Sequence, residues 1–138
     1  MFRKIRLFIA QYWKTIIWLI IVFILSTMQM SNVPKTSLFR IPHFDKIVHF
    51  SMYFISLTLS FTDAYKAKEK LLSLSYYGIA IGNILYGISI EFIQSQIPNR
   101  SADFYDALAN SFGVLIAFLL FRYLNRYRTF LVRWSKII

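Results

Sequence analysis

Residues 16–25 read Ile16-Ile17-Trp18-Leu19-Ile20-Ile21-Val22-Phe23-Ile24-Leu25, an apolar run without a charged side chain. With its flanks, the run extends from about Trp13 to Met30, close to the ~20 residues that an α-helix needs to cross a bilayer. Basic residues precede it, as in a secretory signal peptide, but the following Ser26-Thr27-Met28-Gln29 offers no small-x-small cleavage site. We therefore expect a retained membrane-spanning helix.

The rest of the chain has the same apolar character. Its 138 residues are 57% hydrophobic and 19% aromatic, and the apolar residues form long blocks that a soluble core of this size could not bury. Three further blocks cover about residues 46–62, 71–97 and 103–122, and Pro98 should end the third. The predicted fold is an all-α polytopic membrane protein, a four-transmembrane-helix bundle. Its membrane domain covers residues 1–123, and a basic amphipathic C-terminal tail covers residues 124–138.

Lysine and arginine predict how the bundle is oriented, because cytoplasmic loops carry an excess of them. The N-terminal segment holds four, the connection between the second and third blocks three, and the C-terminal segment five, which is twelve of the sixteen in the chain. Both termini should therefore be cytoplasmic, and the first and third connections should face outward. The expected location is the bacterial cytoplasmic (inner) membrane, which the chain crosses several times.

The net charge of +10 predicts lipid rather than nucleic acid as the charged partner. The basic residues flank apolar blocks, and the C-terminal ones alternate with apolar side chains, so both termini should contact the anionic inner leaflet. The chain has no cysteine, which excludes disulfides and thiolate metal sites.

Polar side chains recur within the second, third and fourth blocks, where ionisable residues are costly and usually functional. At about 100° per residue, those of each block lie on one narrow face of its helix. With the predicted orientation, all three faces should converge near the outer boundary of the membrane. The candidate pocket comprises Asp45, Lys46, His49, Tyr53, Glu91, Gln94, Arg100, Asp103, Asp106 and Asn110.

Several of these residues have simpler interpretations. Asp45 and Asp103 could complete helix N-termini, and Tyr53 could be an aromatic residue at the membrane interface. Gln94 and Asn110 could join helices through hydrogen bonds. His49 could be an isolated interior residue, and Glu91 and Asp106 could pair with Arg100 or Lys46. Glycines at Gly78, Gly82 and Gly113 are expected to permit close helix packing.

The order and spacing of these residues resemble the VanZ-like family of bacterial membrane proteins. The resemblance rests on three pieces in sequence: Asp45-Lys46-x-x-His49-Phe50-x-x-Tyr53, Glu91-x-x-Gln94, and Arg100-x-x-Asp103-x-x-Asp106-x-x-x-Asn110-x-x-Gly113. It covers about residues 45–113. The family takes its name from a protein linked to low-level resistance to teicoplanin, so the resemblance implies a role in the cell envelope. It implies no agreed reaction.

Three functions fit this pattern. In the first, which we favour, the outward polar pocket binds an envelope component such as a cell-wall precursor, a lipid headgroup or a glycopeptide, with a role of the teicoplanin-resistance type. In the second, the chain is a membrane enzyme acting on a lipid-linked substrate, with Glu91 or Asp106 as base and His49 as acid–base partner. In the third, it is a small structural subunit of an envelope complex. A metal held by Asp45, His49, Glu91 and Asp106 is chemically feasible, but the sequence leads us to expect neither metal nor cofactor.

Overall fold

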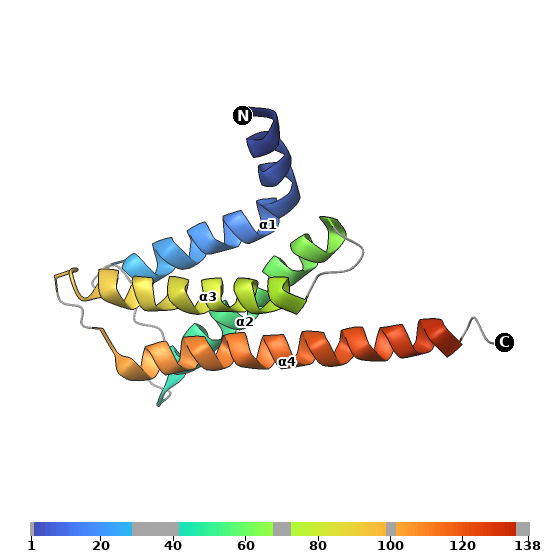
Figure 1. Ribbon diagram of the computed structural model, residues 1–138. Helices are drawn as coiled ribbons and strands as arrows, with labels where there is room; N and C mark the ends of the chain where they lie inside the picture. The colour runs from blue at the N-terminus through green and yellow to red at the C-terminus, as the bar shows by residue number, and fades with distance from the viewer. Residues whose placement is uncertain (1, 29–41, 68–72, 99–101, 135–138) are drawn as a thin grey trace.

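The computed structural model describes residues 2–28, 42–67, 73–98 and 102–134, and this part of the chain is α-helical apart from short turns. The helices are α1 (Phe2–Thr27), α2 (Phe44–Ala67), α3 (Ser73–Gln94) and α4 (Phe104–Trp134) (Figure 1). Three stretches are long and apolar enough to cross a bilayer, namely Phe2–Thr27, Ser75–Gln94 and Phe104–Arg126. The predicted all-α membrane fold is thus confirmed. The fourth span, expected on α2, and the cytoplasmic position of the termini stay predictions.

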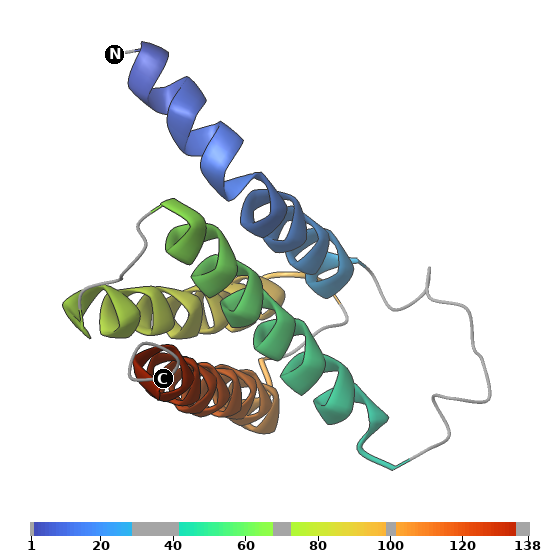
Figure 2. The same cartoon turned by 90° about the vertical axis from the view of Figure 1, so that its right-hand side faces the viewer.

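Helix α2 lies between α1 on one side and α3 and α4 on the other (Figure 2). Its side chains Tyr53, Leu57 and Phe61 are almost fully buried and form the core together with Val22, Ala80, Val114 and Ala117. A helix covered by protein on most sides can carry polar residues that a lipid-facing helix cannot. The buried position of α2 is therefore compatible with its polar residues, although α2 is not among the three helices with a stretch long and apolar enough to cross a bilayer.

The glycines behave differently at the two places where close packing was expected. A Cβ atom at Gly113 of α4 would lie 3.0 Å from the backbone nitrogen of Phe54 and closer still to the backbone oxygen of Phe50, so α2 and α4 touch there through their backbones. At Gly78 and Gly82 of α3, a Cβ would meet no described atom within 4 Å. The face of α3 that carries these two residues is exposed, and their expected role in helix packing stays a prediction.

Helix α1 bends at Tyr12, where φ is −104° and ψ is 18°, and its N-terminal part turns away from the bundle (Figure 1). The predicted membrane block began at Trp13, directly after this bend. Where a helix breaks, the next backbone N–H groups lose their acceptors one turn earlier. Here Asp63 of α2 supplies an acceptor, because its Oδ2 receives hydrogen bonds from Thr15 N at 3.1 Å and from Thr15 Oγ1 at 2.9 Å.

This buried carboxylate corrects one sequence assignment. Asp63 was placed in the charged second connection, but α2 continues to Ala67 and the residue is only 2% exposed. Helix α4 likewise continues to Trp134, past the predicted end at Arg122. The division into a membrane domain and a C-terminal tail stays a prediction, as does the contact of the tail with lipid.

Candidate functional site

Lys46 lies in the first turn of α2 and contacts three aspartates. Its Nζ is 2.8 Å from Asp45 Oδ2, 2.5 Å from Asp103 Oδ2 and 2.7 Å from Asp106 Oδ1. Asp103 also completes the N-terminus of α4, because its Oδ1 accepts a hydrogen bond from Tyr105 N at 2.8 Å. The hydrogen bond from Lys46, aided by that from Tyr105, holds the pKa of Asp103 below its usual range. Lys46 therefore ties the start of α2 to the start of α4.

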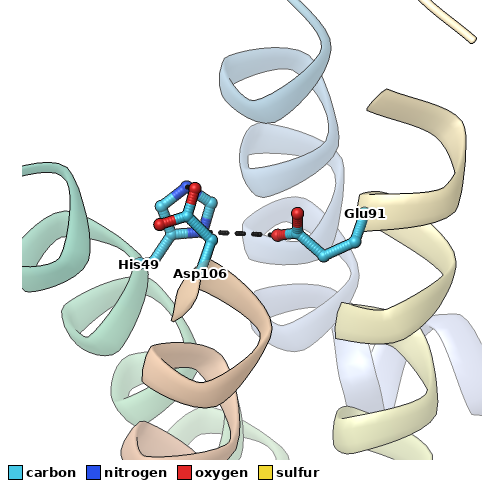
Figure 3. Close-up of side chains that lie close together, drawn as sticks. All are labelled: His49, Glu91 and Asp106. Atoms are coloured by element: carbon cyan, nitrogen blue, oxygen red, sulfur yellow. Dashed lines mark ion pairs between the residues drawn. The ribbon is translucent and has the colours of Figure 1, made fainter. Parts of the chain in front are cut away.

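One helical turn further along α2, His49 faces carboxylates from both α3 and α4 (Figure 3). Its Nδ1 is 3.0 Å from Asn110 Oδ1 and 3.8 Å from Glu91 Oε1, and its Nε2 is 3.7 Å from Asp106 Oδ2. Asn110 Nδ2 donates to Glu91 Oε1 at 3.3 Å. His49, Glu91, Asp106 and Asn110, which we call the acid–histidine cluster, thus join three helices at one end of the bundle.

Glu91 is the most enclosed acid of this cluster. Its side chain is 7% exposed, against 15% for His49 and for Asp106. Its Oε2 accepts a hydrogen bond from Asp103 N at 3.4 Å, in addition to the contact with Asn110. In the described part of the chain, no lysine or arginine forms an ion pair with Glu91. A carboxylate in this position is expensive unless a proton or a cation compensates it.

Tyr53 lies one turn deeper than His49, and its ring packs where Gly87 of α3 faces Asn110 of α4. A Cβ at Gly87 would lie 3.1 Å from this ring and 3.4 Å from Asn110 Cβ, so a glycine is needed to admit the tyrosine. The residue is 1% exposed, which does not fit an aromatic at the membrane interface. Its hydroxyl finds no hydrogen-bond partner among the described atoms.

The other predicted pocket residues are more dispersed. Gln94 Nε2 donates to the backbone oxygen of Ser26 at 2.7 Å and so joins α3 to α1 rather than to the cluster. Arg100 lies outside the described residues. The side chains that the structure does bring together are Asp45, Lys46, His49, Glu91, Asp103, Asp106 and Asn110. Their function as a pocket stays a prediction.

Sequence reasoning missed how far the polar face of α2 continues. Ser56 Oγ donates to Asn83 Oδ1 at 2.6 Å, and Asn83 Nδ2 lies 3.4 Å from Ser60 Oγ, so α2 and α3 are joined at mid-depth. Asp63 follows Ser60 by three residues and therefore continues the same face. That spacing was the available signal that Asp63 is a buried group and not part of a loop.

The family model that matches this chain is VanZ/LLP1, and it covers residues 1–126. No curated protein and no solved structure matches the chain significantly. The family match includes all four helices down to Arg126 and every residue of the acid–histidine cluster. It agrees with the motif order seen in the sequence, and the chain therefore belongs to the VanZ/LLP1 family of proteins.

Proposed function

We propose that this membrane protein resides in the bacterial inner membrane and binds a polar envelope component at the acid–histidine cluster. The observation that carries the proposal is Glu91, a buried carboxylate on α3 that is contacted from α2 and α4 and has no lysine or arginine partner among the described residues. Charged groups inside membrane helices are rare unless they serve a site. Purely structural acids are usually compensated, as the three aspartates around Lys46 are.

The predicted orientation supports an outward-facing site. The cluster lies where α2 begins, α3 ends and α4 begins, and the predicted topology puts twelve of the sixteen basic residues on the other side of the membrane. This side would face the space in which cell-wall precursors and lipid headgroups are exposed. Resistance of the teicoplanin type is one phenotype that follows if such a ligand is sequestered, and Arg100, from the outer connection, is proposed to contribute to its recognition.

Glu91→Gln tests the proposal because it removes the charge and keeps the size of the side chain. We expect a lipid-linked species to co-purify with the wild-type protein, visible as an added mass in native mass spectrometry, and to be lost in Glu91→Gln. Gln96→Ala is the matched control, since Gln96 is exposed just beyond the same end of α3 and its side chain donates to Ser95 Oγ at 2.9 Å, away from the cluster. Teicoplanin susceptibility is measured in the same strains.

The two alternatives predict different results. If Glu91→Gln fails to accumulate in the membrane, the cluster holds the bundle together and the binding proposal is wrong. An enzymatic role is favoured by one observation, the 3.7 Å approach of His49 Nε2 to Asp106 Oδ2, which would have to shorten to hydrogen-bond distance for proton transfer between the two groups. Turnover of a labelled lipid-linked precursor by purified wild-type protein, abolished by His49→Gln, would replace binding by catalysis.

A further inference from the structure

Two groups of three side chains place possible metal-ligand atoms within 4.8 Å of one another. In the group Asp45, Asp103 and Asp106, the ammonium of Lys46 already lies within 2.8 Å of each carboxylate, so the protein supplies the cation itself. Within the described part of the chain, no lysine or arginine lies inside the group His49, Glu91 and Asp106 in this way. Lys46 contacts Oδ1 of Asp106, while Oδ2 faces His49.

Asn110 fixes which nitrogen of His49 carries the proton. Its Nδ2 donates to the carboxylate of Glu91, which can only accept, so its Oδ1 is the atom that faces the imidazole. An amide oxygen requires a donor, and Nδ1 of His49 therefore carries a hydrogen. In the neutral ring, Nε2 then presents a lone pair to Asp106 Oδ2 at 3.7 Å. Two electron-rich atoms face each other there, and a positive species between them would stabilise the arrangement.

Tyr53 provides an independent observation beneath the same group. Its hydroxyl is buried and has no hydrogen-bond partner among the described residues, and its ring lies beside the positions of Gly87 and Asn110. A buried hydroxyl without a partner costs about 1–3 kcal/mol. A divalent metal ion bound at such a group commonly keeps one or more waters, and such a water could form a hydrogen bond with the Tyr53 hydroxyl. Among the described residues, Glu91 thus lacks a lysine or arginine partner and Tyr53 lacks a hydrogen-bond partner, and the two residues lie at the same end of the bundle.

We propose that His49, Glu91 and Asp106 bind a divalent ion of the Zn²⁺ or Mn²⁺ type, with Asn110 holding the imidazole in the required tautomer. One imidazole and two carboxylates suit these ions better than Mg²⁺ or Cu⁺. In an occupied site, bonds of about 2.0–2.2 Å place ligand atoms roughly 3.0–3.5 Å apart. The possible ligand atoms now lie within 4.8 Å of one another, so the side chains would have to move inward to hold the ion. Glu91 Oε1, which lies 3.8 Å from His49 Nδ1, would also have to turn toward Nε2.

This inference goes beyond the proposed function, since cation binding is measured on the purified protein without an envelope ligand. The protein is purified in detergent with a removable tag that contains no histidine, treated with chelator and titrated with Zn²⁺ by calorimetry. We expect about one ion per chain. His49→Gln and Glu91→Gln should each weaken binding by more than 10-fold, and Asn110→Ala by about 10- to 100-fold, the range for groups that orient a metal-binding histidine.

The chain offers a matched control, because its only other histidine is His43, just before α2. His43→Gln should leave the affinity unchanged. Equal Zn²⁺ binding by wild type and His49→Gln would overturn the proposal. The absence of Zn²⁺ binding in wild type would also overturn it, because a proton on His49 Nε2 would then be the compensating charge.

A second measurement avoids variants that fail to fold. Mn²⁺ added to the wild-type protein should show electron-spin-echo modulation from a coordinated imidazole nitrogen. Modulation without any imidazole contribution would exclude His49 as a ligand. If Zn²⁺ binds but no envelope species co-purifies, the ion site stands and the proposed function fails. If the species co-purifies but Zn²⁺ does not bind, the proposed function stands and the ion site fails.

Discussion

The contact between α2 and α4 at Gly113 allows us to estimate how one substitution changes the free energy of unfolding. In Gly113→Ala, the new methyl group would meet two backbone atoms, the oxygen of Phe50 and the nitrogen of Phe54. Backbone cannot rotate aside as a side chain can, so the two helices must separate. Forcing an extra methyl group into a closed contact typically costs about 1–3 kcal/mol. We expect the upper half of this range, because α2 and α4 share the most extensive interface in the bundle.

A substitution at a second glycine separates the cost of the close contact from the gain in helix propensity. Alanine is a better helix former than glycine by about 1 kcal/mol, and this gain accompanies either substitution. Gly82→Ala, on the exposed face of α3, receives the gain without meeting any described atom within 4 Å. Because the helix-forming term is common to both variants, the difference in their free energies of unfolding measures the contact at Gly113. It should be about 2–3 kcal/mol.

The assay is reversible unfolding in mixed micelles, followed by tryptophan fluorescence. The indole of Trp18 donates to the backbone oxygen of Met52 at 2.9 Å, so its emission reports whether α1 remains docked on α2. Gly113→Ala should unfold at a clearly lower fraction of denaturing detergent than Gly82→Ala. Equal midpoints for the two variants would refute the close crossing of α2 and α4, and with it the geometry that brings Asp106 and Asn110 to His49.

Three further predictions follow from other contacts. Asp63→Asn and Thr15→Ala should each destabilise the protein by about 1–2 kcal/mol, and their double variant should cost less than the sum, because both disturb the hydrogen bond from Thr15 Oγ1 to Asp63 Oδ2 at the bend of α1. The pKa of Asp103 is lowered in the folded state, so its ion pair with Lys46 stabilises the fold at pH values above the unfolded pKa of about 3.9. This contribution to stability is lost as the pH falls through the folded pKa. Lys46→Gln should therefore raise the pKa of Asp103 in a carbon-13 NMR titration. In this cysteine-free chain, single cysteines at positions 36 and 99 should react with an impermeant thiol reagent from outside, and one at position 68 should not. The opposite labelling would show that the predicted orientation is wrong.

The sequence was sufficient to predict the helices and the grouping of most polar residues. Apolar blocks of membrane length leave few alternatives to helices, and polar residues at helical spacing within them must face protein or water. His49, Glu91 and Asp106 could therefore be assigned to one cluster before any geometry was known. Their partners could not, since whether Lys46 contacts Asp103 depends on how far α4 is shifted along α2.

Other features depended on backbone details that spacing does not reveal. The bend at Tyr12 involves neither proline nor glycine, so nothing in the sequence marked the place where Asp63 would be needed as an acceptor. The glycines show a related limit. Gly78 and Gly82 form a familiar packing pattern on α3, yet the close backbone contact occurs at Gly113, because the crossing point depends on all four helices together.

The polar face of α2 also indicates which end of the bundle carries chemistry. At the end of α2 near Ala67, Asp63 receives two hydrogen bonds from Thr15, and at mid-depth Ser56 and Asn83 bond each other. These polar groups are satisfied within the chain, as stabilising contacts should be. At the opposite end, a buried acid has no lysine or arginine partner in the described residues, a histidine nitrogen faces a carboxylate, and a tyrosine hydroxyl has no partner there. Groups of this kind are costly for stability alone, and their concentration around His49 is the reason why we propose that an external species binds there.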